Sequence, residues 1–397
     1  MPSPTILIAG AGIGGLTAAL SLAALGRDVT LVERATGFSE IGAGLQLSPN
    51  ASRILIDLGL GPALRRIATE PERVMVHAMR SGALLGEVAL GAFMRERFGA
   101  PYWVAHRADL QMVLLDAVRS RPNIRLLVGR SVIAVEDGPE AASALVETAG
   151  GARETLRADL VVGADGIRSR VRQALGGARE PVFSGSAAWR ATVARDSVPS
   201  SLAGNETGLW LGRGLHVVHY PIAGGRLVNI VAVRGQAAPV EEWGAVGDPA
   251  ELRATFAEAA PPLRALLDLP EDWLVWSLFD LRPTRTARGR IALLGDAAHP
   301  VLPFLAQGAA LAIEDAAALA GTLSEADRST PAALARYARM RWARVRKVQA
   351  QARRNGRLYH AGSVLGFARD AVMRRLDGRA MAERYAWLYG WTPPSRS

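Results

Sequence analysis

The chain opens with an uncharged stretch from Thr5 to Gly26, whose hydrophobic pattern predicts three elements in succession. A short apolar run over residues 5–9 is typical of a buried strand, and an Ala- and Leu-rich stretch over 16–25 predicts a helix. Glycines at positions 10, 12, 14 and 15 separate the two. Because they interrupt the apolar run and no basic residue precedes it, we interpret the stretch as strand, tight turn and helix rather than as a signal sequence or a membrane span.

The glycine turn matches a dinucleotide fingerprint. Gly10-Ala-Gly12-Ile-Gly14-Gly15 satisfies G-x-G-x-x-G between strand and helix, and the next predicted strand ends at Glu33. Gly10 permits the tight turn, Gly12 lets a pyrophosphate approach the backbone, and Gly15 lets the helix pack closely on the strand. The helix N-terminus then faces the phosphates, and Glu33 accepts hydrogen bonds from a ribose. This motif predicts a bound dinucleotide but leaves NAD and FAD both open.

Two later segments repeat the plan of a buried strand that ends in a carboxylate. Residues 158–171 contain Asp165-Gly166 before a basic helix start, and residues 289–300 contain Gly295-Asp296. With the three motifs in this order over nearly the whole chain, the sequence resembles the single-component FAD-dependent aromatic hydroxylases, such as the p-hydroxybenzoate, salicylate and 3-hydroxybenzoate hydroxylases. FAD is therefore the expected dinucleotide.

The resemblance implies an α/β fold in which a Rossmann-like FAD-binding domain carries an inserted antiparallel-sheet substrate domain and C-terminal helices, as in p-hydroxybenzoate hydroxylase. Strand-like stretches at 187–193, 207–211, 216–222 and 227–233, separated by Gly and Pro turns, independently predict the antiparallel sheet. The expected boundaries are 1–180 and 282–330 for the two parts of the FAD-binding domain, 181–281 for the sheet domain, and 331–397 for the helical region.

The resemblance also implies roles for individual residues. In the family, the aspartate of the Gly-Asp motif holds the FAD ribityl chain, and the Asp-Gly motif lies near the pyrophosphate and the path of NAD(P)H. Residues 41–51 look like the loop over the flavin, and residues 106–110 look like the stretch whose arginine contacts FAD. The expected cofactor-binding residues are Gly10, Gly12, Gly14, Gly15, Glu33, Arg34, Gln46, Arg107, Asp165, Asp296, Pro303, Gly308 and Ala309.

Some of these positions have alternative interpretations. Arg168 and Arg170, next to the Asp-Gly motif, are explained equally well as surface residues of a helix. Gln46 stands where the related 6-hydroxynicotinate hydroxylases carry histidine, which disfavours a pyridine substrate. NADH and NADPH stay open as the co-substrate, because Glu33 would serve FAD.

The hairpin around Gly224-Gly225 carries the candidate substrate-binding residues. With a period of two, His216, Val218 and Tyr220 share one face of a strand, while Val217 and His219 share the other. In the 3-hydroxybenzoate and 6-hydroxynicotinate branches, a histidine and a tyrosine at this spacing bind the substrate's hydroxyl and carboxylate, which implies His216 and Tyr220 here. A residue pair of this kind suits proton exchange with a phenol.

Other interpretations of the two histidines stay open. His219 could point inward instead, or both histidines could be satisfied residues of the sheet. A metal site is not expected, because His216 and His219 point to opposite faces and no third ligand is suitably spaced. Trp189, Trp210, Phe304 and Leu45 are candidate apolar walls of the pocket, and core packing explains each of them equally well.

The segment after Pro300 resembles the turn that wraps the flavin ring in the family. Backbone amides at Gly308 and Ala309 would meet the electron-rich pyrimidine edge. Pro303 and Gln307 face the substrate in relatives, so Gln307 joins His216 and Tyr220 as a candidate catalytic residue. Two acids further along, Glu314 and Asp315, are either surface acids or the structural Glu-Asp pair that the family often keeps.

Together the motifs predict a monooxygenase that uses NAD(P)H and O2 to hydroxylate a small phenolic aromatic acid, by analogy with the family through a flavin hydroperoxide. A larger lipid-like, quinone-precursor or polycyclic substrate stays open, as does a non-catalytic FAD-binding scaffold. A flavin-dependent halogenase is disfavoured, because it needs an active-site lysine and the single lysine, Lys347, lies in the C-terminal helices.

Composition and charge exclude or disfavour several other kinds of site. The chain has no cysteine, which excludes disulfides, iron–sulfur clusters and thiolate zinc. The net charge of +10 is concentrated in residues 332–384, which hold 14 Lys and Arg against three Asp and Glu. A charge run of this kind is usually a solvated helix face rather than a nucleic-acid or lipid site. We expect a cytoplasmic monomer or homodimer without nucleic-acid binding or stable membrane insertion.

Overall fold

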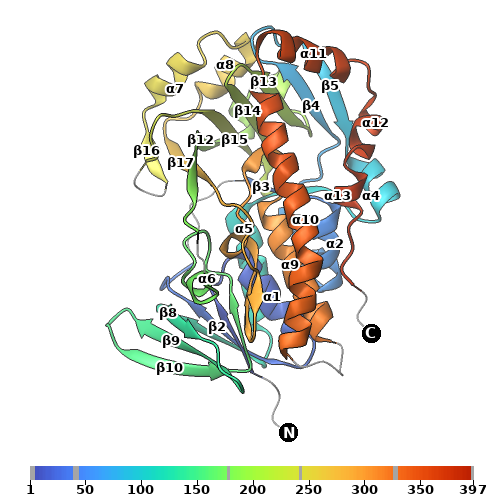
Figure 1. The fold of residues 1–397 in the computed structure, drawn as a ribbon. Helices are drawn as coiled ribbons and strands as arrows, with labels where there is room; N and C mark the ends of the chain where they lie inside the picture. Colours follow the sequence, from blue (N-terminus) through green and yellow to red (C-terminus); the bar gives the residue numbers. More distant parts are fainter. Residues whose placement is uncertain (1–4, 39–43, 177–178, 241–243, 325–329, 395–397) are drawn as a thin grey trace.

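The computed structural model describes residues 5–38, 44–176, 179–240, 244–324 and 330–394. Two large β-sheets set the architecture, one at each end of the molecule in Figure 1. The first sheet has six strands in the order β18-β19-β11-β1-β2-β7, and all neighbours are parallel except β18 and β19. Its strands are β1 (Thr5–Ala9), β2 (Asp28–Glu33), β7 (Ile124–Val128), β11 (Leu160–Gly163), β18 (Ala287–Arg288) and β19 (Ile291–Leu293).

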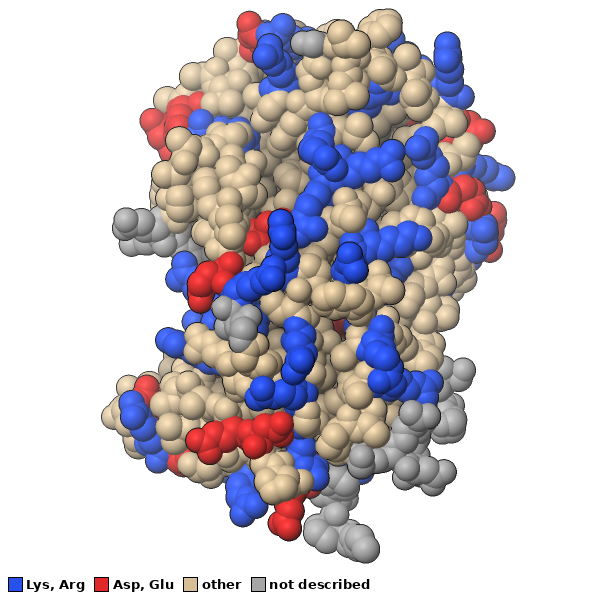
Figure 2. Space-filling view, viewed as in Figure 1, with Lys and Arg blue, Asp and Glu red and all other residues tan. Residues whose placement is uncertain are grey.

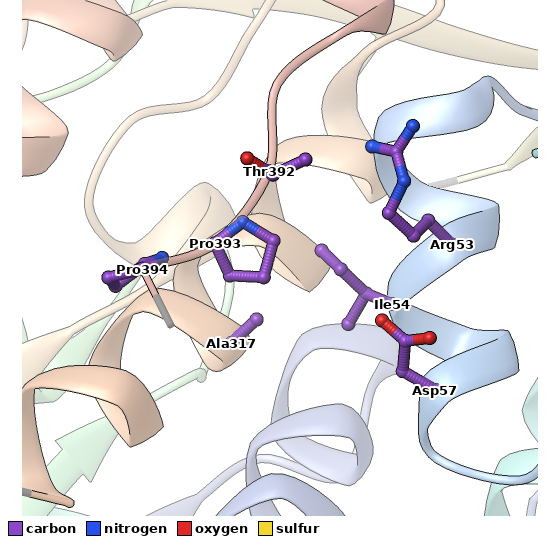
Figure 3. Close-up of a pocket in the computed structure, with 7 residues that line it drawn as sticks. All are labelled: Arg53, Ile54, Asp57, Ala317, Thr392, Pro393 and Pro394. Carbon is purple, nitrogen blue, oxygen red and sulfur yellow. The ribbon is translucent and has the colours of Figure 1, made fainter. Parts of the chain in front are cut away.

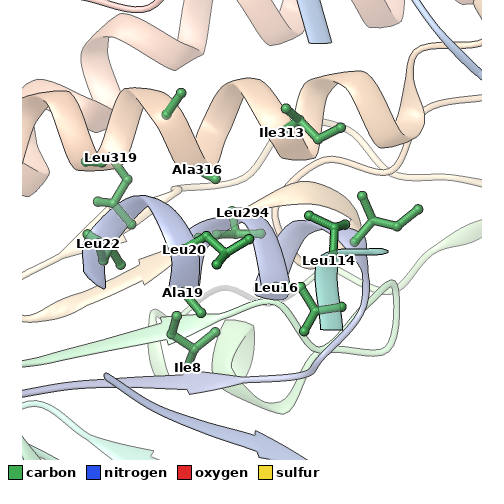
Figure 4. Close-up of a cluster of buried hydrophobic side chains, with 14 of the residues drawn as sticks. Ile8, Leu16, Ala19, Leu20, Leu22, Leu114, Leu294, Ile313, Ala316 and Leu319 are labelled. Atoms are coloured by element: carbon green, nitrogen blue, oxygen red, sulfur yellow. The ribbon is translucent and has the colours of Figure 1, made fainter. Parts of the chain in front are cut away.

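Helices and a small sheet cover the two faces of the six-stranded sheet. On one face, α1 (Ile13–Ala23) packs beneath α5 (Arg107–Arg119) and α9 (Gly308–Leu323), as Figure 4 shows for Leu16, Leu114 and Ile313. Helix α1 is apolar on all sides, which suits a helix whose surface is almost entirely buried by its neighbours. The other face carries α6 (Arg170–Ala174) and a three-stranded antiparallel sheet of β8 (Arg130–Glu136), β9 (Ala142–Thr148) and β10 (Arg153–Ala158).

The second large sheet has eight strands in the order β16-β17-β12-β15-β14-β13-β4-β5. It contains the four strands expected between residues 181 and 281, paired antiparallel as β12, β15, β14 and β13. Two further strands come from residues 73–89, which lie outside that expected span, and β4 pairs parallel with β13. The strands are β4 (Arg73–Ala78), β5 (Leu84–Ala89), β12 (Val182–Ala194), β13 (Thr207–Gly212), β14 (Leu215–Ile222), β15 (Leu227–Gly235), β16 (Ala245–Gly247) and β17 (Trp273–Asp280).

The two faces of the eight-stranded sheet have different partners. One face packs on α7 (Pro249–Thr255) and α8 (Pro261–Leu267) around Trp189, Trp210 and Trp273. The other face turns toward the first domain, where it meets the short helix η5 (Pro303–Leu305) and a two-stranded antiparallel sheet of β3 (Gly44–Leu47) and β6 (Trp103–His106). We call this second side the inner face of the sheet.

The remaining helices connect the two domains and surround their junction. Helix α10 (Thr330–Tyr359) runs along the molecule past both sheets (Figure 1). No helix in the described ranges combines the length and apolarity needed to cross a membrane. The other helices are α2 (Pro49–Asp57), α3 (Gly61–Ile67), α4 (Gly91–Phe98), α11 (Ser363–Met373), α12 (Gly378–Glu383) and α13 (Ala386–Tyr389).

Helix α10 explains much of the basic charge. Lys and Arg side chains gather on the outer face along this helix in Figure 2, and Arg339, Arg346 and Arg354 are exposed there. Arg341 and Arg344 instead point inward and are buried. The arginine-rich stretch is therefore only partly the solvated face that its composition predicts.

Candidate active site

The glycine turn between β1 and α1 has the shape that the fingerprint predicts. Gly10 has a φ of +100°, in the left-handed region that favours glycine. A Cβ at Gly15 would lie 1.8 Å from the carbonyl oxygen of Gly10, so helix and strand pack too closely for any side chain there. A Cβ at Gly12 would meet no atom within 4 Å. The backbone at Gly12 therefore borders open space at a helix N-terminus, where a pyrophosphate fits.

Gly14, by contrast, has a packing role. A Cβ there would lie 2.7 Å from the Leu294 side chain and 3.0 Å from that of Ala312. Gly14 therefore lets α1 approach α9 and the Gly-Asp segment rather than exposing the backbone to a ligand.

Glu33 ends β2 beside this turn. Its carboxylate accepts hydrogen bonds from the backbone N–H groups of Ala11 at 2.7 Å and Ala35 at 2.9 Å. Each carboxylate oxygen keeps a further lone pair, so Glu33 can still accept from ribose hydroxyls. Arg34 is exposed beside it.

Asp296 lies in the short helix η4 (Gly295–Ala297), just after β19, and its side chain is exposed. Desolvation by the surrounding protein raises the pKa of its carboxyl, and the charges of Arg107, at the start of α5, and His299 lower it. Asp296 thus presents a carboxylate at the C-terminal edge of the sheet, where sugar hydroxyls can bind.

Asp165 has a local structural role as well. Its carboxylate accepts from the Ser169 hydroxyl at 2.5 Å and from the backbone N–H of Arg170 at 2.7 Å, which closes the turn before α6. Arg168 and Arg170 are exposed. The buried arginine of this motif is Arg172, which donates to the carbonyl of Ala297 at 2.9 Å and so ties the Asp-Gly segment to the Gly-Asp segment.

The turn before α9 holds an unusual backbone conformation. Ala306 adopts a left-handed φ of +52°, which is rare for a residue with a side chain. Helix α9 then begins at Gly308 without a side-chain cap, and a Cβ at Gly308 would meet no atom within 4 Å. The amides of Gly308 and Ala309 therefore form a helix N-terminus with room for an electron-rich ligand edge. Pro303, at the start of η5, is half-buried nearby.

Gln307 is buried at the base of this turn. Its side-chain amide donates to the Ser48 hydroxyl at 2.9 Å and accepts from Asn50 at 3.1 Å. Asn50 also donates to Glu314 at 2.6 Å. These bonds hold the β3–α2 segment against α9 and so fix the position of Gln307, whose catalytic role stays a prediction.

Glu314 and Asp315 belong to a buried ion cluster. The interpretation of these two as surface acids is wrong, since both are fully buried. Glu314 pairs with Arg341 at 2.9 Å and Arg344 at 2.6 Å, and Asp315 pairs with Arg341 at 2.6 Å. Asp315 also contacts His299 at 2.6 Å and accepts from the backbone N–H of Gly295 at 2.8 Å. These cationic and N–H partners keep the pKa of Asp315 below its usual value despite burial.

The inner face of the eight-stranded sheet carries the predicted substrate residues. The register pairs His216 with Val233 and Tyr220 with Asn229, so both lie on that face. His219 points to the opposite face, where the ring of His77 stacks on Trp210 at 4.5 Å and a Cβ at Gly208 would strike the His219 ring. The predicted alternation along β14 is confirmed.

The residues predicted as apolar walls of the substrate pocket do not all lie on the inner face of the eight-stranded sheet. Trp189 and Trp210 belong to the core under α7 and α8 and do not reach the inner face. Leu45 packs against the core of the first domain. Phe304 does lie on the inner face, with its ring 5.5 Å from that of His216.

His216 is joined to a second histidine that the sequence prediction missed. Its Nδ1 lies 2.9 Å from Nε2 of His360, which directly follows α10, and the ring of Tyr359 is 5.4 Å away. Burial and, secondarily, the charge of His360 lower the pKa of His216 to about 3. The imidazole is therefore neutral at pH 7.

Tyr220 borders the two-stranded sheet of β3 and β6. A Cβ at Gly44 would lie 2.8 Å from the Tyr220 hydroxyl, and the Gly44 N–H donates to Asn229 at 2.6 Å. Burial raises the pKa of Tyr220, so its phenol stays protonated. Gln46, in β3 of the same small sheet, accepts from the hydroxyl of Tyr102.

Comparison with known proteins identifies the architecture. Residues 4–352 match the family model described as an FAD binding domain. The chain belongs to the single-component FAD-dependent aromatic hydroxylases. It is 35% identical to a 3-hydroxybenzoate 6-hydroxylase of Polaromonas naphthalenivorans, covering 97% of this chain and 96% of that one. It is 41% identical to the 3-amino-4-hydroxybenzoate 2-monooxygenase PtnB3 of Streptomyces platensis, covering 98% and 96%.

A solved structure agrees with these relatives. A salicylate hydroxylase in complex with its substrate superposes with a TM-score of 0.82 at 26% identity, covering 98% of this chain and 96% of the other. The predicted family and the p-hydroxybenzoate hydroxylase-like fold are thus confirmed, and the chain is an FAD-dependent monooxygenase. The open backbone at Gly12, the carboxylate of Glu33 beside it and the exposed carboxylate of Asp296 fit FAD as its cofactor.

Proposed function

We propose that this enzyme hydroxylates a small phenolic aromatic acid, with NADH or NADPH as reductant and O2 as the oxygen source. The observation that carries the proposal is the pair His216 and Tyr220, buried on the inner face of the sheet opposite the candidate FAD site. Relatives at 35–41% identity that span nearly the whole chain act on hydroxylated benzoates, which supports the same substrate class here.

Bound FAD would supply the hydride acceptor and the oxygen-activating group, and the protein must prepare the ring. Hydroxylation needs an electron-rich carbon, and removing the phenol proton raises electron density at the ortho and para positions. A neutral imidazole can accept a proton at one nitrogen while it releases one from the other. His216 is neutral at pH 7, so it suits this exchange.

We assign the proton path to the two histidines. In the tautomer with the proton on Nδ1, His216 accepts the phenol proton at Nε2 and passes the Nδ1 proton to Nε2 of His360, 2.9 Å away. His360 is only partly buried, so it can release a proton to solvent. Tyr220, whose pKa burial raises, donates a hydrogen bond to the oxygen that becomes negative.

The test is oxidation of NADH and NADPH by the purified, FAD-loaded protein, with oxygen and hydrogen peroxide followed. The panel is salicylate, 3- and 4-hydroxybenzoate, 3-amino-4-hydroxybenzoate and 6-hydroxynicotinate. We expect one benzoate to accelerate oxidation with little peroxide and to yield a product heavier by one oxygen, or a decarboxylated diol. If every phenol leaves the rate unchanged although FAD is tightly bound, the proposal fails in favour of a larger substrate or a scaffold.

A further inference from the structure

The inner face of the sheet carries three polar side chains with unsatisfied atoms. Nε of Arg190, Oγ1 of Thr192 and Nδ2 of Asn229 are buried and have no hydrogen-bond partner within the described part of the chain. Buried polar groups in folded proteins are nearly always paired, because an unpaired one costs about 1–3 kcal/mol. Unpaired atoms also occur on the opposite face, in the tryptophan-rich core, but the three on the inner face are grouped around a cation and are available to a polar ligand.

The strand register brings these atoms together and next to Tyr220. Thr192 on β12 pairs with Asn229 on β15, and Asn229 pairs with Tyr220 on β14, so the three lie in one row across the sheet. Arg190 lies in the next row, opposite Val231, which in turn pairs with Val218 between His216 and Tyr220. Strands are about 4.8 Å apart, so the Cα of Arg190 is about 10 Å from that of Val218. This distance matches a benzene ring that carries a substituent at each end.

Arg190 provides a cation that lacks an anionic partner. Its guanidinium lies 5.3 Å from the ring centre of Trp276 and forms no salt bridge among the residues that the structure describes. Burial lowers its pKa, and the nearby charge of Arg107 acts in the same direction. The residue as a whole is nevertheless only partly buried. A buried arginine in this setting is stabilised by a bound anion.

A second arginine on the same sheet has the carboxylate partner that Arg190 lacks, although its Nε, like that of Arg190, has no hydrogen-bond partner. Arg234 on β15 also lies over a tryptophan, Trp189, at 5.1 Å, but on the opposite face. It forms a salt bridge with Glu251. Arg190 and Arg234 thus share a residue type, a sheet and an aromatic neighbour, and only Arg234 has a carboxylate partner within the described protein.

We propose that Arg190, assisted by Thr192 and Asn229, binds the carboxylate of the aromatic acid substrate. This inference rests on the proposed function and specifies which end of the substrate each group holds. The guanidinium and the two neutral donors receive the carboxylate oxygens, and His216 with Tyr220 receives the ring hydroxyl. The site therefore selects hydroxylated aromatic acids over neutral phenols of the same size.

The experiment compares 3-hydroxybenzoate with 3-hydroxybenzamide, or the same acid and amide pair of whichever benzoate the enzyme prefers. Binding is measured from the change in the flavin absorbance spectrum and turnover from NAD(P)H oxidation, in the wild type, Arg190→Gln, Arg190→Lys and Arg234→Gln. For Arg190→Gln we expect the Kd and KM of the acid to rise about 100-fold and those of the amide to stay within about threefold. Arg190→Lys should retain part of the preference for the acid, and Arg234→Gln all of it.

Several results would overturn the assignment. Equal losses for acid and amide in Arg190→Gln would give Arg190 a general structural role, and weaker FAD binding or a shifted flavin spectrum without substrate would make the cofactor its partner. The wild type provides a check that needs no variant: if it binds amide and acid equally well, no group recognises the carboxylate. A wild type that neither binds nor oxidises any hydroxybenzoate contradicts the proposed function itself, whereas normal turnover of the acid by Arg190→Gln contradicts this inference alone.

Discussion

The protein contains two buried polar regions that differ in how completely their atoms are paired. Between α9 and α10, both oxygens of Glu314 and both of Asp315 accept hydrogen bonds from cationic, amide or N–H donors. Nη2 of Arg341 lacks an acceptor, but this guanidinium packs 5.1 Å from the ring centre of Trp391. On the inner face of the sheet, Arg190 and Asn229 keep unpaired donors.

The difference indicates that the ion cluster between α9 and α10 has a structural role, whereas the polar side chains on the inner face have a role in binding. A closed ion cluster fixes how helices pack, and breaking it leaves a charge buried without a partner. An open polar row is incomplete until a ligand supplies the missing acceptors. Changes in the first region should therefore affect folding, and changes in the second should affect binding.

The largest expected effect is on stability, from Glu314→Ala. Removing this carboxylate leaves Arg341 and Arg344 buried without it, which should lower the free energy of unfolding by about 3–5 kcal/mol. Urea unfolding of the FAD-loaded protein measures the loss. Asp280→Ala is the matched control, since its pair with Arg353 is partly exposed and should contribute at most about 1 kcal/mol. Equal losses for the two variants would contradict the structural role of the cluster.

The second prediction concerns Gly12 in the glycine turn, where the protein leaves space beside the backbone. Gly12→Ala places a methyl group where the protein has room but a pyrophosphate would bind, so FAD affinity should fall about 100-fold or more while the apoprotein keeps its stability. Fluorescence titration with FAD measures the affinity. Gly150→Ala, in an exposed turn far along the chain, should change neither property. Unaltered FAD affinity in Gly12→Ala would remove the fingerprint from the cofactor site.

Substitution of the two histidines of β14 distinguishes a catalytic role from a packing role. His216→Gln removes the contact with His360 and should lower kcat for the preferred benzoate about 10- to 100-fold. His219→Gln changes a residue of similar burial on the opposite face and should leave kcat within about twofold. A kcat that falls equally in both variants would indicate a general distortion of the sheet.

The same histidines make stability depend on pH. Burial lowers the pKa of His216 to about 3 and that of His219 to about 4, below the value of about 6.5 in an unfolded chain. The unfolded state therefore takes up protons first, so stability is fully present above pH 6.5 and is lost as the pH falls toward 4 and 3. Each histidine adds a slope of about 1.4 kcal/mol per pH unit in that window. Urea unfolding between pH 4 and 8 should show a shallower slope for His219→Gln than for the wild type.

The smallest effect is expected on the outer face of α10. Arg354→Ala removes an exposed charge and should change the free energy of unfolding by less than about 0.5 kcal/mol. FAD affinity and kcat should also stay unchanged. A large loss of activity would show that the basic helix takes part in function after all.

Much of the fold was readable from the sequence because its signals are local. The glycine turn, the strand that ends at Glu33 and the alternation around His216 each depend on residues close together in the chain, and the structure reproduces them. The inclusion of β4 and β5 in the large sheet was not predicted, since β4, which also carries β5, pairs with β13 across more than 100 residues of chain.

Contacts between distant segments also explain why the sequence did not reveal some site residues. His360 reaches His216 across 144 positions, and Glu314 meets Arg344 across 30, so neither contact leaves a local pattern. Arg190 did leave a signal, because a charged residue interrupts the apolar strand Ala187–Val193. Its significance depends on the strand register, which places it beside Asn229 and Tyr220 rather than at the surface.

A conspicuous surface pocket lies away from these residues. It has a volume of about 410 Å³ and lies where the C-terminal segment crosses α2 and α9 (Figure 3). It is lined by Arg53, Ile54, Asp57, Ala317, Thr392, Pro393 and Pro394, none of which belongs to the candidate site. The proposed chemistry therefore belongs to the inner face of the sheet and not to this cavity.

The most direct test of that argument is the fate of ¹⁸O2 during oxidation of NADH or NADPH with the preferred hydroxybenzoate, in the wild type and in His216→Gln and His219→Gln. We expect one ¹⁸O atom in the product of the wild type and of His219→Gln at similar rates, and much slower product formation by His216→Gln. Labelled hydrogen peroxide without labelled product in the wild type, or equal product formation by all three proteins, would contradict the assignment of the inner face as the place where the ring is hydroxylated.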